Sequence, residues 1–380
     1  MVKCKHSVQH ILQHHINHLS HLSFTSWHLR TLHALRKCRT LELGGHIDKC
    51  NCCNNIHISY NSCRNRHCPQ CQGHKREEWI AAREKEILPV PYFHVVFTLP
   101  HELNPMVLKH PSVIYKFLFK AAWDTLNTFG KKELQAQIGM IAVLHTWGQN
   151  LSLHPHLHCI VPAGGAITSG KWKHAKFKRK FLFPVKALSK MFRAKFVHLL
   201  RKSPLKIDQS LYDILFSKKW VIYAKKPFGK PQHVIEYLGR YSHKVAISNH
   251  RILEVNKFKN IVKFSAKNYR NGGKNTIIQL STIDFIRRFQ LHILPKGFTR
   301  MRHYGCLSSS WKKDKLPKIQ AQLSGSTFIV SQLNKPQKLS SLLRKCPKCK
   351  KGTLITIAEF SGRGPPKSQI LMLLTQYAYV

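Results

Sequence analysis

Two pairs of cysteines near the N-terminus constrain the fold of this chain more than any other feature. Cys50 and Cys53 form one CxxC pair, and Cys68 and Cys71 form a second pair after an interval of 14 residues. Two such pairs at this spacing are typical of a zinc ribbon, in which four thiolates hold one Zn²⁺ in a tetrahedron. We therefore expect these four cysteines to bind a structural zinc ion.

Neighbouring residues offer alternatives to this ligand set. Cys63 and His67 are nearby substitutes, whereas Cys52 is expected to face away. Free buried thiols are the weaker interpretation, because this segment has little apolar core of its own without a metal. Cys346 and Cys349 form an isolated CxxC pair near the C-terminus, which either completes a zinc site with distant ligands or has no role.

The charge balance indicates a polyanionic partner. The chain carries 63 Lys and Arg against 16 Asp and Glu, which gives a formal net charge of +47. Release of counterions favours binding of such a chain to nucleic acid over a membrane surface. The scarcity of carboxylates argues against nucleases that use three acidic metal ligands. No apolar run reaches the ~18 residues of a membrane-spanning helix, and no signal peptide is evident, so we expect a cytoplasmic, DNA-associated protein without a membrane partner.

A strand with alternating histidines is the first candidate catalytic feature. In the stretch 154–158, alternation places His156 and His158 on one face and turns Leu157 into the core. Two imidazoles on one strand face can share a divalent cation, either Mg²⁺ or Mn²⁺. Taken alone, this pattern is more often structural than catalytic. The candidates for a third protein ligand are, in order, His154, Gln149 and His145.

Two tyrosines one helical turn apart are the second catalytic candidate. Tyr237 and Tyr241 occupy positions i and i+4 of a predicted helix and therefore share one face. A tyrosine can attack a phosphodiester and form a phosphotyrosine, which conserves the bond energy for rejoining. The spacing alone is also common in ordinary helix packing. Together with the histidines, the charge and the cysteines, it favours cleavage of single-stranded DNA.

The order of the predicted elements favours an α+β fold over a doubly wound parallel sheet, because strands and helices alternate irregularly and end in antiparallel hairpins. We expect a helical segment plus zinc-binding domain over residues 1–89. A catalytic domain should follow over 90–305, and a basic, partly disordered segment over 306–380. The predicted strands are 92–99, 138–145, 220–224, 245–255, 259–266 and 276–281, and the main predicted helices are 79–87, 111–136, 185–202 and 208–216.

Several stretches together resemble the insertion sequence 91 family of transposases. The cysteine-rich segment, which contains CRNRHCPxC, resembles the N-terminal zinc-binding domain of the family. The histidine strand looks like its HUH motif, and the tyrosine helix looks like its paired-tyrosine motif. The matching stretches, which arrive in the order expected for the family, are 46–53, 62–71, 145–158, 237–248 and 302–305.

The resemblance implies an HUH endonuclease: an antiparallel sheet flanked by helices, with the HUH histidines on a central strand. Members of the family nick one strand, bond a tyrosine to the 5′ phosphate and release a 3′ hydroxyl for rolling-circle transfer. Carried over to this chain, His156 and His158 become metal ligands, and Tyr237 and Tyr241 each serve one of two successive cleavages. Arg240 becomes a candidate phosphate contact.

Two other functions compete with this interpretation. A plasmid or phage replication initiator or relaxase would use the same chemistry on a different substrate, but the CRNRHCPxC segment favours the transposase. A zinc-dependent DNA-binding protein without catalysis would use the histidines and tyrosines only for packing. Hairpin-bearing element ends in the flanking DNA would favour the transposase, whereas a plasmid origin would favour the initiator.

Overall fold

The computed structural model describes residues 5–15, 19–22, 24–175, 182–224, 234, 237, 239, 244–268, 272–325 and 344–362. Within these residues, helices and strands are mixed, and all the paired strands run antiparallel. The predicted α+β class is therefore confirmed. No helix in this part of the chain is long and apolar enough to cross a membrane.

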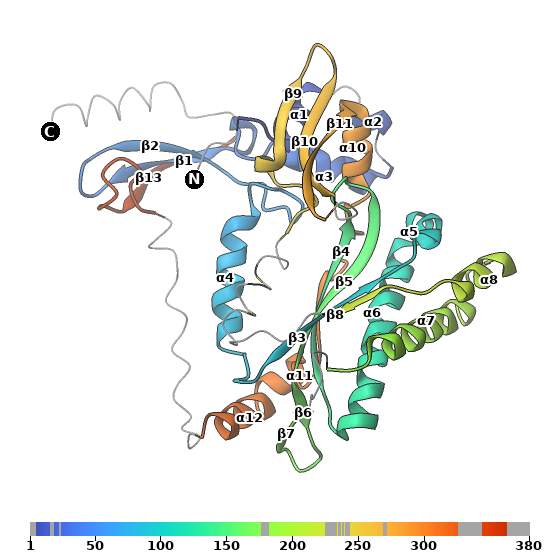
Figure 1. The fold of residues 1–380 in the computed structure, drawn as a ribbon. Helices are drawn as coiled ribbons and strands as arrows, with labels where there is room; N and C mark the ends of the chain where they lie inside the picture. The colour runs from blue at the N-terminus through green and yellow to red at the C-terminus, as the bar shows by residue number, and fades with distance from the viewer. Residues whose placement is uncertain are drawn as a thin grey trace.

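A five-stranded sheet forms the centre of the molecule (Figure 1). In spatial order its strands are β12 (Met301–Gly305), β4 (Gly139–Trp147), β5 (Leu153–Pro162), β3 (Tyr92–Thr98) and β8 (Ile222–Ala224). The strands β4, β5 and β3 lie in the middle and are rich in apolar residues that are buried on both faces. The predicted histidine strand is therefore β5, at the centre of the sheet.

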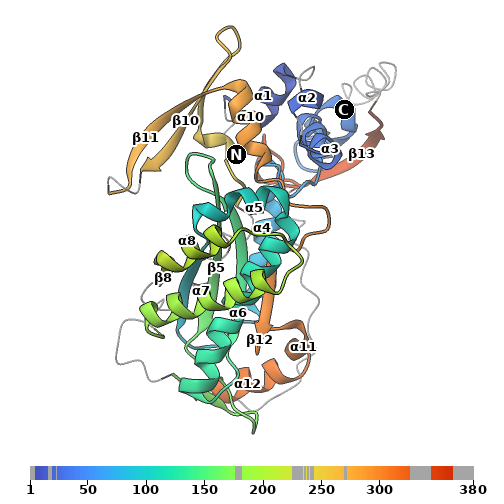
Figure 2. The same ribbon diagram turned by 90° about the vertical axis from the view of Figure 1, so that its right-hand side faces the viewer.

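Four helices cover one face of this sheet (Figure 2). The long helix α6 begins at Pro111, a residue that suits the first turn of a helix because its missing N–H needs no partner there. Its apolar residues recur at helical spacing and pack on alternate residues of β5, namely Leu157, Cys159 and Val161. This packing leaves the histidines of β5 on the opposite face. The four helices are α5 (Asn104–Lys109), α6 (Pro111–Phe129), α7 (Val185–Arg201) and α8 (Gln209–Ser217).

Among the residues that the structure describes, the opposite face of the sheet carries a smaller apolar cover. A smaller apolar cluster there joins Ile141 and Ile160 of the sheet to Leu316 and Ile319, and Tyr237 packs against it. The elements on this side are α4 (Gln72–Glu84), the hairpin β6 (Gly164–Ala166) and β7 (Trp172–His174), α11 (Ser309–Lys312) and α12 (Lys315–Ser324). On this side of the sheet, His145, His156 and His158 line a cleft.

A second core joins the N-terminal helices to a hairpin sheet from the later part of the chain. The predicted strands between residues 245 and 281 form this three-stranded sheet in the order β11-β10-β9. Its elements are β9 (Ile252–Asn256), β10 (Ile261–Asn268), β11 (Lys274–Ser281) and α10 (Thr282–Gln290), packed on α1 (Val8–His14), α2 (Leu19–Leu22) and α3 (Ser26–Arg36). Figures 1 and 2 both place this unit at one end of the central sheet.

A third sheet joins a hairpin from the N-terminal part of the chain to a strand from its C-terminal part. Its middle strand, β1 (Gly45–Cys50), pairs on one side with β2 (Ile56–Tyr60) and on the other with β13 (Leu354–Phe360). The predicted division at residues 89 and 305 stays a prediction. The last segment nevertheless contributes two helices and one strand to the described part of the chain.

Candidate functional site

The histidines of β5 occupy the position that alternation predicts. Leu157 is fully buried under the helices, whereas His156 and His158 lie on the other face of the sheet. Their ring centroids are 4.9 Å apart, so both imidazoles can reach one ion.

His145 lies beside this pair and is a candidate third ligand. It lies on β4 directly opposite His156 in the antiparallel register, and cross-strand neighbours lie close together on the same face. The candidate ligand atoms of His145, His156 and His158 all lie within 4.8 Å of one another. Trp147 stacks on the His145 ring with a centroid separation of 4.5 Å and so restricts its orientation. The geometry favours His145 over His154, the first candidate in the predicted order, because His145 joins this group and His154 does not.

His154 has a different role in the geometry. The Nδ1 atom of His156 lies 2.7 Å from the His154 carbonyl oxygen, so Nδ1 carries the proton and donates it in a hydrogen bond. That bond fixes the tautomer of His156 and leaves Nε2 available for a metal. Desolvation lowers the pKa of His156 to about 4 and also lowers the pKa of His158 well below its ordinary value. Both side chains are therefore neutral near pH 7, the form that binds metals.

A further histidine, His94, connects this group to Tyr237. His94 is buried on β3, with Nε2 2.9 Å from Nδ1 of His158 and Nδ1 3.1 Å from the Tyr237 hydroxyl. The His94 and His158 rings are nearly parallel, with centroids 5.1 Å apart. Sequence reasoning missed His94. The predicted strand 92–99 contains His94, but the sequence does not show which strand lies beside it. The pairing of β3 with β5 brings His94 to His158.

The other catalytic candidates can be placed only in part. Tyr237 is helical and half-buried. Tyr241 and Arg240 lie outside the described residues. Gln149 lines the cleft beside the histidines without joining the three-histidine group.

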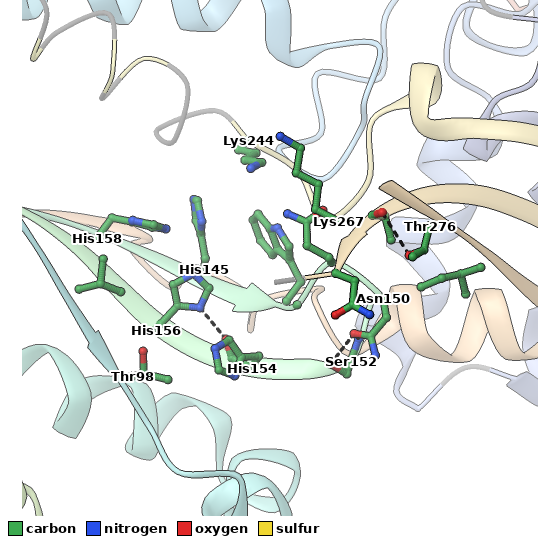
Figure 3. Close-up of a pocket in the computed structure, with 17 residues that line it drawn as sticks. Thr98, His145, Asn150, Ser152, His154, His156, His158, Lys244, Lys267 and Thr276 are labelled. Atoms are coloured by element: carbon green, nitrogen blue, oxygen red, sulfur yellow. Dashed lines mark hydrogen bonds between the residues drawn. The ribbon is translucent and has the colours of Figure 1, made fainter. Parts of the chain in front are cut away.

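The three histidines open into a cleft of about 760 Å³ between the central sheet and the hairpin of β10 and β11 (Figure 3). Lys244 and Lys267 line the cleft across from the histidines, as do Asn150 and Thr276. Among the described residues, no carboxylate lines this cleft. Its charge therefore suits an anionic ligand such as a nucleic-acid backbone.

The cysteines form two separate clusters of four rather than one. Cys68 and Cys71 gather with Cys38 and Cys63, whereas Cys50 and Cys53 gather with the C-terminal pair. The predicted single set of Cys50, Cys53, Cys68 and Cys71 is thus corrected, and Cys63 is a member of its cluster instead of a substitute. Cys52 is exposed and belongs to neither cluster. His67 is buried away from the thiols, with Nε2 3.4 Å from the backbone nitrogen of Leu294.

The first cluster lies in the core beneath the N-terminal helices. Sγ of Cys38 is 3.5 Å from Sγ of both Cys68 and Cys71, and Sγ of Cys63 is 3.6 Å from that of Cys71. A zinc ion with Zn–S distances of about 2.3 Å would place its sulfur atoms roughly 3.8 Å apart, close to these values. Cys38 belongs to no CxxC pair, so the sequence pattern gave no signal for it.

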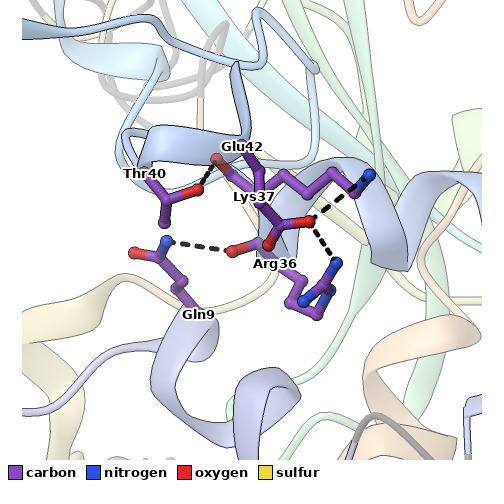
Figure 4. A network of polar contacts seen from close by, with 5 residues as sticks. All are labelled: Gln9, Arg36, Lys37, Thr40 and Glu42. Carbon is purple, nitrogen blue, oxygen red and sulfur yellow. Dashed lines mark hydrogen bonds and ion pairs between the residues drawn. The ribbon is translucent and has the colours of Figure 1, made fainter. Parts of the chain in front are cut away.

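A polar network holds Cys38 in place, and Figure 4 shows the part of it around Gln9, Arg36 and Glu42. The side-chain amide of Gln9 donates to the carbonyl oxygens of Arg36 and Cys38, at 3.0 and 2.6 Å. Gln70, from the turn between Cys68 and Cys71, donates in turn to Gln9 at 3.0 Å. Glu42 forms an ion pair with Arg36 at 2.6 Å across the short segment that follows α3. The network therefore holds Cys38 next to the pair formed by Cys68 and Cys71.

Comparisons with known proteins cover most of the chain. A family model described as "Transposase zinc-binding domain" matches residues 9–99, and one described as "Putative transposase" matches residues 139–315. A protein of Sinorhizobium fredii named "Putative transposase" is 40% identical over 375 residues, which cover 91% of this chain and 93% of that protein. The transposase for insertion sequence element IS801 of Pseudomonas savastanoi pv. phaseolicola is 28% identical over 320 residues, which cover 79% and 75% of the two chains. No solved structure matches the chain.

Proposed function

We propose that this chain, which belongs to the insertion sequence 91 family of transposases, cuts and rejoins single-stranded DNA through a 5′-phosphotyrosine. As a transposase it acts on DNA. The single-strand chemistry is our inference, and one observation carries it: Tyr237 is linked through His94 to a group of three histidines in a basic cleft.

His145, His156 and His158 are the proposed metal ligands. Bound there, Mg²⁺ or Mn²⁺ would polarise the scissile phosphate and offset the charge that develops during attack. The fit rests on three imidazoles whose candidate ligand atoms lie within 4.8 Å of one another. The open side of the group faces the cleft, where a phosphate has room to approach.

His94 would hold Tyr237 in its nucleophilic form. His158 would hold the metal through Nε2 and keep its ring proton on Nδ1, which would donate to Nε2 of His94. Neutral His94 carries its own proton on Nδ1 and donates it to the Tyr237 oxygen. A donor at this oxygen favours the phenolate, which is the attacking species.

The proposed reaction exchanges one ester bond for another. The Tyr237 phenolate attacks phosphorus, the bond between phosphorus and the 3′ oxygen breaks, and the 3′ oxygen takes up a proton from solvent. The product is a tyrosine esterified to the 5′ phosphate beside a free 3′ hydroxyl, which can reverse the reaction on a new end. Tyr241, one turn further along the sequence, would perform the second cleavage.

The cluster of Cys38, Cys63, Cys68 and Cys71 is the proposed site of a structural zinc ion. It falls within the residues matched by the transposase zinc-binding domain. Its thiols belong to the core that also holds the β9–β11 sheet, so the ion would brace the unit that forms one wall of the cleft.

A nicking assay tests the proposed function. Single-stranded oligonucleotides carrying the ends of the element would be incubated with the protein and Mn²⁺ or Mg²⁺ and resolved on denaturing gels. We expect a protein-linked 5′ product and a free 3′ fragment, both abolished by chelator. Binding of these oligonucleotides without cleavage in either metal would contradict the proposal and favour a non-catalytic role.

We expect the enzyme to prefer Mn²⁺ to Mg²⁺. Imidazole nitrogen suits Mn²⁺ better than the harder Mg²⁺, and no carboxylate lines the cleft among the described residues. The Mn²⁺ concentration that gives half-maximal cleavage should be lower by about tenfold or more. Titration of cleavage rate with each metal at fixed ionic strength checks this, and equal half-maximal concentrations would argue against an all-histidine site.

Variants that keep only one of the two tyrosines can show whether His94 acts on Tyr237. In a Tyr241→Phe background, His94→Phe should slow adduct formation about tenfold to a hundredfold, because the change removes the donor to Tyr237 and the partner of His158. In the matched Tyr237→Phe background, His94→Phe should slow adduct formation less, because it then removes only the hydrogen-bond partner of His158. Equal losses in the two backgrounds would show that His94 does not act on Tyr237.

A further inference from the structure

The second cysteine cluster joins residues almost 300 positions apart in the sequence. Sγ of Cys50 lies 3.7 Å from Sγ of Cys349, and Sγ of Cys53 lies 3.7 Å from Sγ of Cys346. All four sulfur atoms lie within 4.8 Å of one another, and none is in a disulfide. A tetrahedral zinc site with Zn–S bonds of about 2.3 Å needs sulfur separations of roughly 3.8 Å.

The two halves of this cluster share one turn, in which the amides of Asn54 and Lys350 donate to the carbonyl oxygens of Cys50 and Cys346, at 3.1 and 2.9 Å. In the first half, the amide of Cys52 donates to Sγ of Cys50 at 3.4 Å, and Asn54 has a φ of 55°. In the second half, the amide of Gly352 donates to Sγ of Cys349 at 3.3 Å, and Lys350 has a φ of 59°. Both left-handed residues come four positions after the first cysteine of their pair. Backbone amides aimed at sulfur stabilise the thiolate form, which is the form that binds metal.

The contact between the halves is close and leaves room only for glycine at one point. A Cβ atom added to Gly352 would lie 2.5 Å from Sγ of Cys50 and 2.5 Å from Cβ of Cys52. Next to it, the backbone amide of Thr353 donates to the side chain of Asn51 at 2.8 Å, and the amide of Asn51 donates to the Thr353 carbonyl oxygen at 3.1 Å.

The strands that follow the cysteines extend this contact into a sheet. Cys50 pairs with Leu354 at the start of the β1–β13 ladder. Further along, Asp48 of β1 accepts hydrogen bonds from Ser59 of β2 at 3.3 Å and from Thr356 of β13 at 2.8 Å. Asp48 is buried, so these partners satisfy a charge that would be costly on its own. The segment 344–360 is therefore built to dock on the N-terminal hairpin.

We propose that Cys50, Cys53, Cys346 and Cys349 bind a second zinc ion, which fastens the C-terminal segment to the N-terminal hairpin. The site is a zinc ribbon whose two knuckles come from opposite ends of the chain. It is separate from the cluster of Cys38, Cys63, Cys68 and Cys71, and its second knuckle lies outside the residues matched by either family model. Without residues 344–360 the first knuckle would have only two ligands.

The number of zinc ions bound to full-length variants tests this site. In a His156→Ala/His158→Ala background, which removes the proposed catalytic metal site, we expect two zinc ions and no iron by plasma mass spectrometry, and one zinc ion after Cys346→Ser/Cys349→Ser. Cys50→Ser/Cys53→Ser should also hold one, and so should the variant that combines all four changes, because both pairs serve the same ion. Cys52→Ser is the matched control and should keep two. Further loss of zinc in the combined variant, or iron in place of zinc, would overturn the proposal.

Cysteine alkylation of the wild-type protein gives a second test that does not depend on the folding of a variant. In the zinc-loaded protein, Cys346 and Cys349 should react far more slowly than exposed Cys52. A zinc chelator should raise their reactivity at least about tenfold, while Cys159 and Cys306, buried elsewhere, stay protected and report an intact core. Reaction of Cys349 as fast as Cys52 before chelation, or no change on chelation, would overturn the proposal.

Discussion

Replacement of both Tyr237 and Tyr241 by phenylalanine should abolish the covalent product between protein and DNA. Phenylalanine keeps the ring but lacks the oxygen that would attack phosphorus. Neither position can then form an ester bond to DNA. We expect the cleavage rate to fall by at least about a thousandfold, as is usual when a nucleophile is removed. The measurement is the protein-linked band on a denaturing gel with single-stranded element ends.

The single variants make this result specific. Each should retain cleavage by the remaining tyrosine but lose the second of two successive cleavages, so that strand transfer fails. Tyr223→Phe, on an exposed tyrosine outside the cleft, is the matched control and should behave as wild type. Full cleavage by the double variant, with normal metal dependence, would show that another residue is the nucleophile.

Loss of His145 should be the second large effect. His145→Ala removes one of the three imidazoles proposed to hold the catalytic metal, and we expect cleavage to fall at least about a hundredfold. The loss should be partly recovered at high Mn²⁺, because the two remaining histidines still offer ligands on one strand. Cleavage rates measured across a metal titration separate weaker metal binding from a slower chemical step.

His154→Ala is the matched control for this comparison. His154 lines the same cleft, yet its contact with His156 is made through its backbone carbonyl, which alanine retains. We therefore expect a loss of less than about tenfold, smaller than that of His145→Ala. If the two variants ranked in the opposite order, His154 would be the third ligand.

The fold was predictable where local pattern decides the structure. Alternation in β5 correctly placed Leu157 in the core and His156 and His158 on the other face, because successive side chains of a strand point to opposite faces of the sheet. The strands β3 and β4 and the hairpin β10–β11 were also close to their predicted bounds. In β3 and β4, a run of apolar residues ends at a proline or a turn.

The site was less predictable where its partners come from distant segments. His145 could be chosen over His154 only from the register of β4 against β5, which the sequence pattern does not state. Likewise, Cys50 and Cys53 lie against the cysteines of the C-terminal segment instead of the next pair along the chain. Spacing identifies a CxxC knuckle reliably, but the choice of its partner depends on tertiary packing.

The most direct test of the account is to locate the DNA on the protein after cleavage. The covalent complex formed on a single-stranded element end with Mn²⁺ would be digested with protease and nuclease and analysed by tandem mass spectrometry. The account predicts a nucleotide esterified through its 5′ phosphate to Tyr237 or Tyr241. A nucleotide bonded to any other residue, or cleavage with no covalent intermediate, would contradict it.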